Sequence, residues 1–203
     1  MEKNIYTIGY SGYAVDDFIN ELKKYHISAL IDVRSSPYST YYTDYNRPAL
    51  EKRLKQSGMF YRNYAQEFGA RQENRLFYNS EGYLDFEKFA KSEQFISGVD
   101  KVCGGTDKGY KAALMCAEKN PLECHRCILI SRAFSDREYN IVHLLPNGET
   151  KTQKDIETEL LNEYFPDREQ FSLFEAPDEN ELLDRAYRLK NAEIGYRQEE
   201  NAG

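Results

Sequence analysis

The chain has 203 residues, of which 40% are hydrophobic and 30% charged, and its formal net charge is −7 at pH 7. This length suits one α/β domain with a tail, and the lack of any apolar run of about 18 residues excludes a membrane-spanning helix. With 17 Tyr and 11 Phe the chain can build a core, which excludes disorder of the whole chain.

Strand-like and helix-like patterns alternate along the chain. Buried strands show as short continuous apolar runs, and helices as apolar residues at helical spacing. The predicted elements, in chain order, are a strand over residues 4–8, a helix over 16–25, a strand over 28–33, a loop over 37–46, a helix over 47–57, an irregular segment over 60–79, a helix over 84–103, a strand over 111–116, a helix from 120 to about 134, a strand over 139–145 and a helix over 155–164.

This alternation predicts an α/β fold with three layers, in which a mostly parallel sheet is flanked by helices. We expect residues 1–150 to form that domain and residues 151–203 to add a helix and an acidic tail with a further helical stretch. Ligands of such sheets bind beyond the carboxyl ends of the strands. Those ends are residues 9–12, 32–37 and 116–121, where the chemistry of the chain is expected.

The start of the chain leads directly into the first predicted strand, without the apolar segment of a signal peptide. This favours the cytoplasm and no membrane partner. The four Cys residues of a chain in that compartment are more often thiols or ligands than disulfides.

Asp32 and Arg34 stand at the end of the second predicted strand. An acid and a guanidinium that leave a buried strand together are costly unless they pair or face a cleft. Asp32 is therefore either a loop cap with Arg34 as its solvated partner, or an acid/base residue beside an arginine that binds phosphate or carboxylate.

Cys116 and Glu118 follow the third buried strand. A thiol that faces a helix N-terminus is a candidate nucleophile, and an inert buried thiol is the alternative. Glu118 is an acid/base candidate. The residues predicted to line one cleft at this edge are Asp32, Arg34, Cys116, Glu118 and the segment 9–12.

Cys124, His125 and Cys127 lie early in the predicted helix that starts at residue 120. On a helix Cys124 and Cys127 share one face, while the side chain of His125 points roughly 100° away from that of Cys124. The pattern therefore favours neither a zinc site nor a redox pair, and we expect no metal and no cofactor.

The segments TIGYSG, LIDVRSSPYS, ALMCAEKNPLECHR and VHLLPNG follow one another over roughly residues 5–148. They resemble the prokaryotic family called domain of unknown function 488, which implies a compact α/β domain without an established activity. A weaker similarity is to rhodaneses, which imply sulfur transfer. The family pattern falls on Gly9, Ser11, Gly12, Asp32, Arg34, Pro37, Cys116, Glu118, Pro121, Cys124, His125 and Arg126. The anion-binding candidates among them are Gly9, Ser11, Gly12, Arg34, His125 and Arg126.

Residues 34–75 carry eight Lys/Arg against four Asp/Glu, whereas residues 155–203 carry five against fourteen. Aromatic side chains are interleaved with arginines in the basic segment, which suits stacking on bases and binding of phosphates. The alternative is that these tyrosines pack in the core or form a lid. The residues expected to contact nucleic acid are Tyr41, Tyr42, Arg47, Arg62 and Arg71.

Residues 170–174, with the sequence QFSLF, resemble the pentapeptide that binds the bacterial sliding clamp. An extended segment with one amide and two adjacent apolar side chains suits preformed pockets. Gln170, Leu173 and Phe174 are therefore candidate partner-binding residues, and docking on the chain's own domain is the alternative.

These features together predict an enzyme that acts on DNA or a nucleotide, with a link to DNA repair. Its catalytic candidates are Asp32, Cys116 and Glu118. Two alternatives stay open: a non-catalytic module that binds nucleic acid or a nucleotide, and a rhodanese-like or phosphatase-like cysteine enzyme for a small anion.

Overall fold

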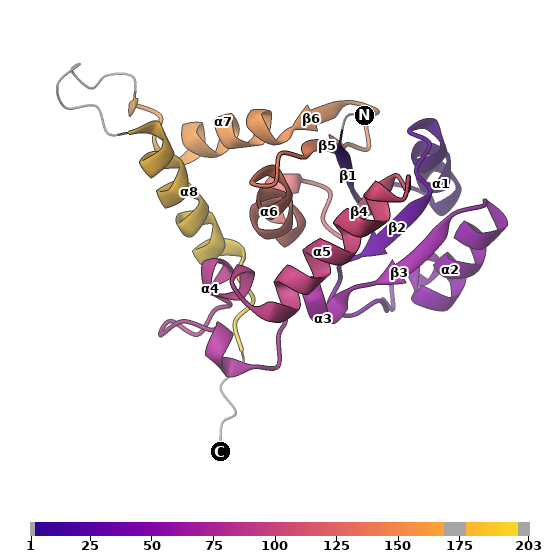
Figure 1. Cartoon of the computed structure of the whole chain (residues 1–203), viewed down its shortest axis with the longest axis horizontal. Coiled ribbons are helices and arrows are strands. Elements are labelled where there is room, and N and C mark those ends of the chain that lie inside the picture. Colours follow the sequence, from indigo (N-terminus) through magenta and orange to yellow (C-terminus); the bar gives the residue numbers. More distant parts are fainter. Residues whose placement is uncertain (1–2, 169–177, 199–203) are drawn as a thin grey trace.

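The computed structural model describes residues 3–168 and 178–198 of the chain (Figure 1). Its centre is a six-stranded sheet with the strand order β3-β2-β4-β1-β5-β6. The strands are β1 (Asn4–Gly9), β2 (Ala29–Asp32), β3 (Phe60–Asn63), β4 (Ala112–Cys116), β5 (Asn140–Leu144) and β6 (Thr150–Thr152). Neighbouring strands from β3 to β5 pair in parallel, and β6 pairs antiparallel with β5. The predicted α/β class with a mostly parallel sheet is thereby confirmed.

Helices cover both faces of this sheet and complete the three predicted layers (Figure 1). On one side lie α1 (Val15–Lys24) and α2 (Arg47–Gln56). On the other side lie α3 (Ala65–Phe68), α4 (Phe86–Ala90), α5 (Glu93–Asp107), α6 (Arg132–Ser135), α7 (Gln153–Tyr164) and α8 (Glu179–Ile194). We call the first side the α1/α2 face and the second the α5/α6 face.

Side chains of the strands alternate between the two faces, so that each strand contributes to two cores. Leu30 of β2 and Met115 of β4 pack on the α1/α2 face. Their neighbours Ile31 and Leu114 pack on the α5/α6 face. All five residues of β4 are buried, because a central parallel strand is covered on both sides.

Some elements differ from the sequence prediction. β3 is an edge strand in which Tyr61 alone is buried, and β6 has no buried residue, so neither shows a continuous apolar run. The predicted helix over residues 84–103 is divided, and the side chain of Ser92 accepts a hydrogen bond that caps the start of α5. Gly104 and Gly105, which directly follow the predicted helix over residues 84–103, lie inside α5.

The helix predicted from residue 120 to about 134 is also interrupted. A 3₁₀ turn over Pro121–Glu123 is followed by Cys124, whose backbone is extended with φ −139° and ψ 133°. A π-helix over Arg126–Ser131 then leads into α6. This break at Cys124 determines the geometry of the candidate site.

The C-terminal part of the chain packs on the α5/α6 face. Ile156 and Leu160 of α7 and Tyr187 of α8 belong to its core. The predicted boundary between an α/β domain over residues 1–150 and a C-terminal part over residues 151–203 stays a prediction.

The clamp-like peptide that contains Gln170, Leu173 and Phe174 lies outside the described residues, so its docking on a sliding clamp also stays a prediction. Within the ranges 3–168 and 178–198, no helix has the length and apolar character needed to cross a membrane.

Candidate functional site

The segments that follow β1 and β4 are fastened together at the carboxyl edge of the sheet. The N–H groups of Tyr10 and Ser11 donate to the carbonyl oxygens of Cys116 and Ala117, each at 3.0 Å. Because these bonds occupy both amides, the loop after β1 supports the loop after β4 and does not offer these two donors to an anion.

Asp32 and Arg34 form a buried ion pair. Nε and Nη2 of Arg34 donate to the two carboxylate oxygens of Asp32 at 2.9 and 2.6 Å, and the hydroxyl of Tyr61 donates to the same carboxylate at 2.7 Å. Arg34 also donates to the carbonyl oxygen of Tyr45 at 2.9 Å and lies over the ring of Tyr10. The pair therefore anchors the loop after β2 from the inside.

The structure separates Asp32 from Cys116, contrary to the prediction that they line one cleft. In the register of β2 and β4, Asp32 is the partner of Met115, which packs on the α1/α2 face. Cys116 instead belongs to the core of the α5/α6 face. A shift of one residue along a strand moves a side chain to the other face of the sheet. The sequence pattern alone therefore does not show whether Asp32 and Cys116 lie on the same face. Asp32 is committed to Arg34 and Tyr61 and is not placed for catalysis beside Cys116.

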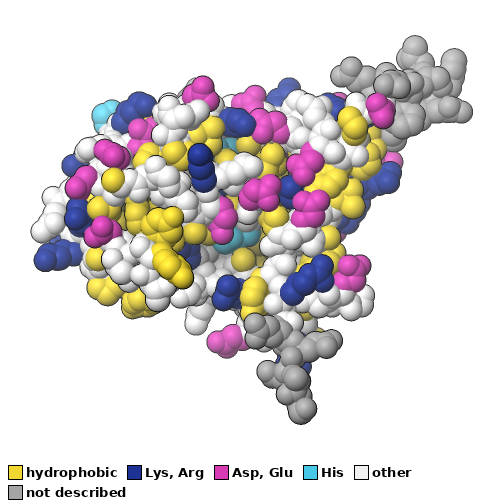
Figure 2. All heavy atoms as spheres, turned by 180° about the vertical axis from the view of Figure 1, so that it is seen from behind, with side chains coloured by type: hydrophobic (Ala, Val, Ile, Leu, Met, Phe, Trp, Pro, Cys, Tyr) yellow, Lys and Arg dark blue, Asp and Glu magenta, His cyan; other side chains and the backbone are white. Residues whose placement is uncertain are grey.

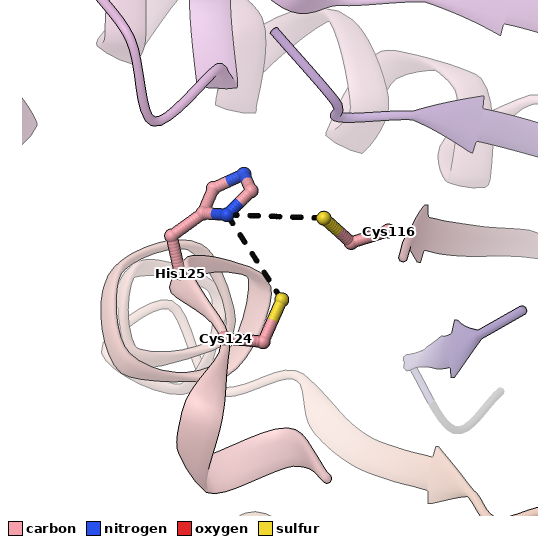
Figure 3. A group of neighbouring side chains, drawn as sticks. All are labelled: Cys116, Cys124 and His125. Carbon is pink, nitrogen blue, oxygen red and sulfur yellow. Dashed lines mark hydrogen bonds between the residues drawn. The ribbon is translucent and has the colours of Figure 1, made fainter. Parts of the chain in front are cut away.

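Cys116, Cys124 and His125 form a buried group on the α5/α6 face, which we call the thiol–imidazole group. The Nδ1 atom of His125 lies 3.9 Å from both sulfur atoms, and the three ligand atoms lie within 4.8 Å of one another. Figure 3 shows Cys116 reaching in from the end of β4 toward the other two side chains. Both cysteines are free thiols, and all three side chains are buried.

The extended backbone of Cys124 makes this group possible. The angle of roughly 100° expected between Cys124 and His125 assumes a continuous helix, and that assumption is wrong because helical backbone begins only at His125. The two adjacent side chains therefore both reach toward Cys116 (Figure 3). Cys127 turns elsewhere, with its sulfur 3.9 Å from Nε2 of His143.

Val33 and Glu118 supply polar partners to the thiol–imidazole group. Nε2 of His125 donates to the carbonyl oxygen of Val33 at 3.0 Å, because a carbonyl oxygen only accepts. The thiol of Cys124 donates to Oε2 of Glu118 at 2.9 Å. Glu118 is half-buried and Lys119 is exposed, so the carboxyl group lies between the buried group and solvent.

The surroundings distinguish the two thiols. Burial raises the pKa of Cys124, but the hydrogen bond from Cys116 and the charges of Arg126 and His125 outweigh it and hold this pKa well below its ordinary value. The hydrogen bond with Cys124, together with burial, raises the pKa of Cys116. Burial and the charge of Cys124 raise the pKa of Glu118. Cys124, rather than the predicted Cys116, is thus the thiol with the greater anionic character.

Arg126 holds the loop after β4 in place. Its guanidinium is fully buried and donates to the carbonyl oxygens of Glu118 at 2.7 Å and of Lys119 at 3.5 Å. An anion that used Arg126, as the sequence predicts, would have to compete with these contacts. In the structure its role is to orient the segment that carries Glu118.

Replacing Gly9 with alanine is expected to lower the free energy of unfolding by about 1–3 kcal/mol, because the added methyl group overpacks this edge. A Cβ atom at Gly9 would stand 1.8 Å from the carbonyl oxygen of Glu118. Urea denaturation measures the change. In the control Gly104→Ala, the new Cβ meets nothing within 4 Å inside α5, and stability should rise by up to about 1 kcal/mol. Unchanged stability of Gly9→Ala would contradict the close contact between the two loops.

The residues predicted to contact nucleic acid are exposed but do not share one face. Tyr41 is 91% and Tyr42 47% exposed in the loop after β2, and Arg47 begins α2. Arg62 of β3 points to the α5/α6 face, since its partner in β2 packs there. Arg71 lies over a tyrosine ring near the end of α8. Of the five predicted residues, Tyr41, Tyr42 and Arg47 lie together, in the loop after β2 and at the start of α2.

Two cavities lie away from this edge. One of about 630 Å³ is bounded by α4, α5, α6 and α8, and one of about 190 Å³ lies between β3 and α5. Neither is lined by the thiol–imidazole group.

Comparisons with known proteins give one finding. The family model described as "Domain of unknown function DUF488" matches residues 14–133, more than half of the chain. No curated protein and no solved structure matches the chain. The predicted similarity to rhodaneses is not shown by these comparisons.

Proposed function

This chain belongs to the family of Domain of unknown function DUF488, and from the geometry of its site we propose that it is an enzyme acting on DNA or a nucleotide. Its reaction centre is the carboxyl edge of the sheet on the α5/α6 face. Glu118 is the acid/base residue, and Cys124 replaces Cys116 as the reactive thiol. Asp32 and Arg34 are assigned a positioning role.

The observation that carries the proposal is that four ionisable side chains meet at the carboxyl edge of the sheet, where apolar side chains could fill the core equally well. Cys116, Cys124 and His125 contact one another, and Glu118 contacts Cys124. Burying such groups costs free energy, so a fold that retains them together at the strand ends is typical of a reaction centre.

Glu118 is suited to proton transfer because it is the half-buried member of this constellation. Its main chain is fixed by Arg126, and its carboxyl group accepts a hydrogen bond from Cys124. A carboxyl group held in this way at the boundary with solvent can exchange a proton with a bound molecule.

The aromatic loop after β2 supports a nucleotide or single-stranded DNA as substrate. Tyr42 packs edge-on against Tyr10, which directly follows β1, with ring centroids 5.5 Å apart. Exposed aromatic faces such as that of Tyr41 stack on bases, and a nearby arginine such as Arg47 binds phosphate. Figure 2 shows acidic and basic side chains interspersed on the side opposite to that of Figure 1, so this side has no broad basic face for phosphate contacts.

Replacing Glu118 with glutamine tests the proposal. The full-length protein is incubated with nucleotides and with lesion-bearing oligonucleotides, and products are identified by mass spectrometry. We expect the wild type to convert at least one of them and Glu118→Gln to lower the rate by about 10²–10⁴-fold, the usual contribution of an acid/base residue. Binding, measured by fluorescence anisotropy, should change little.

Glu123→Gln is the matched control, since Glu123 is close in sequence but pairs with Lys190. This variant should keep the wild-type rate. The near-complete burial of Cys116, Cys124 and His125 favours one alternative, a non-catalytic binding module. Binding of a nucleotide or oligonucleotide without any product would establish that alternative, and neither binding nor product would overturn both.

A further inference from the structure

The thiol–imidazole group has the composition and spacing of a metal-binding site. Cys116, Cys124 and His125 offer two sulfur donors and one imidazole nitrogen. We propose that these three side chains bind one zinc ion, through the two Sγ atoms and Nδ1 of His125. Thiolate and imidazole ligands together select zinc over hard cations such as magnesium and calcium.

The distances in the group are close to those of a tetrahedral zinc site. Zinc bonds to sulfur and to histidine nitrogen place the two donors about 3.6 Å apart at the tetrahedral angle. Nδ1 of His125 lies 3.9 Å from Sγ of both Cys116 and Cys124. The two Nδ1–Sγ distances therefore need to shorten by only a few tenths of an ångström, and the two Sγ atoms, which lie within 4.8 Å of each other, have to stand about 3.8 Å apart.

The hydrogen bond from His125 to Val33 orients the imidazole for this role. Nε2 donates to the carbonyl oxygen of Val33 at 3.0 Å, so the proton of the neutral ring lies on Nε2 and the lone pair on Nδ1 faces the sulfurs. Histidine ligands of metals almost always donate their second N–H to a carboxylate, carbonyl or water in this way.

The charges around the group balance when a divalent ion is present. Two thiolates and the carboxylate of Glu118 carry three negative charges, which zinc and the buried guanidinium of Arg126 would neutralise. Among the described residues, Arg126 forms no ion pair with a carboxylate, although it is fully buried. A buried cation without a partner is costly. Zinc with two thiolates is neutral, so the carboxylate of Glu118 is the negative charge that balances Arg126.

Glu118 lies beside the proposed metal site, since its Oε2 is 2.9 Å from Sγ of Cys124. Three protein ligands with one open position are the arrangement of catalytic zinc, whereas structural sites use four protein ligands. A carboxylate beside the open position can accept a proton from zinc-bound water. This catalytic meaning rests on the proposed function through the acid/base role of Glu118 and makes Cys124 a metal ligand in place of a free reactive thiol, while the binding of zinc itself does not depend on that function.

Metal titration of the full-length protein tests the site. The protein is stripped with a chelator under a non-thiol reductant, titrated with Zn²⁺ and analysed for bound zinc. We expect one tightly bound zinc ion per chain and a rise in thermal stability on binding. Co²⁺ in place of zinc should give the intense thiolate charge-transfer and visible bands of a tetrahedral site with two sulfur ligands.

Three variants identify the ligands. Cys116→Ser and Cys124→Ser should each weaken zinc binding by more than about 100-fold, since loss of an outer-shell partner alone costs 10–100-fold. Cys103→Ser is the matched control, because Cys103 lies in α5 outside the group, and it should bind zinc as the wild type does. Circular dichroism shows whether each variant is folded, and the cobalt spectrum of the wild type is decisive if the ligand variants unfold.

Several results would overturn the site. The reduced wild type could fail to bind zinc at stoichiometric concentration, the cobalt spectrum could lack thiolate bands, or Cys124→Ser could bind zinc as tightly as the wild type does. Zinc binding without turnover of any nucleotide or oligonucleotide would contradict the proposed function and leave the metal site standing. Turnover by metal-free protein would contradict a catalytic role of the zinc ion and leave the proposed function standing.

Discussion

Replacing Asp32 with asparagine is expected to lower the free energy of unfolding by about 3–5 kcal/mol, the usual cost of removing one partner from a buried ion pair. Asp32 is fully buried and Arg34 is 5% exposed, so water cannot replace the lost carboxylate. The substitution also weakens the acceptor of the Tyr61 hydroxyl. The cost arises because the guanidinium of Arg34 stays buried without a counter-charge.

Urea denaturation of the variant and its controls measures this effect. Asp16→Asn removes the carboxylate of an exposed pair with Arg53 and should cost less than about 1 kcal/mol. The double variant Asp32→Leu with Arg34→Met removes both charges and should be more stable than Asp32→Asn. If Asp32→Asn changes stability as little as Asp16→Asn does, the ion pair does not anchor the loop after β2.

This result would also bear on the proposed substrate. Arg34 donates to the carbonyl oxygen of Tyr45, whose ring stacks on that of Tyr10 with centroids 4.4 Å apart. Loss of the ion pair should therefore loosen the loop that carries Tyr41 and Tyr42. Binding of a nucleotide should weaken in Asp32→Asn even though Asp32 is not at the reaction centre.

The order of the elements could be predicted from the sequence, because central parallel strands need apolar side chains on both faces. The runs that form β2 and β4 are buried throughout and show that pattern. β3 could not be predicted from it, because an edge strand with a single buried residue, Tyr61, leaves no such signal.

The edge of the sheet that carries the candidate site could be predicted from the sequence, but the set of side chains that meet there could not. Two details decide which side chains meet: the register that puts Asp32 opposite Met115, and the extended backbone of Cys124. The Asn-Pro start predicts a helix, and nothing in its apolar spacing shows that it is interrupted four residues later. The sequence signal for this group is the presence of Cys124 in the family pattern, which the assumption of a continuous helix hides.

His143 is the basis of the last prediction, on the dependence of stability on pH. It is fully buried between Thr7, whose hydroxyl lies 2.8 Å from Nδ1, and Gln153, whose Oε1 lies 3.0 Å from Nε2. Since Gln153 also donates through its amide nitrogen to Tyr187, Oε1 is the acceptor and Nε2 carries the proton. Burial, with the charge of Arg126 second, lowers the pKa of His143 to about 3.

A histidine with a folded pKa below its unfolded value of about 6.5 destabilises the fold in acid, because only the unfolded chain binds the proton in that range. Above about pH 6.5 the imidazole is neutral in both states and its titration does not change the free energy of unfolding. As the pH decreases from about 6.5 toward 3, this free energy falls. Between pH 7 and pH 4 the wild type should lose about 3 kcal/mol relative to His143→Gln, which lacks this titration. Urea denaturation of both proteins across this range measures the difference, and the imidazole resonances of folded His143 should show no titration above about pH 4. A difference independent of pH, or a folded His143 that titrates near its unfolded pKa, would contradict the burial of a neutral imidazole between Thr7 and Gln153.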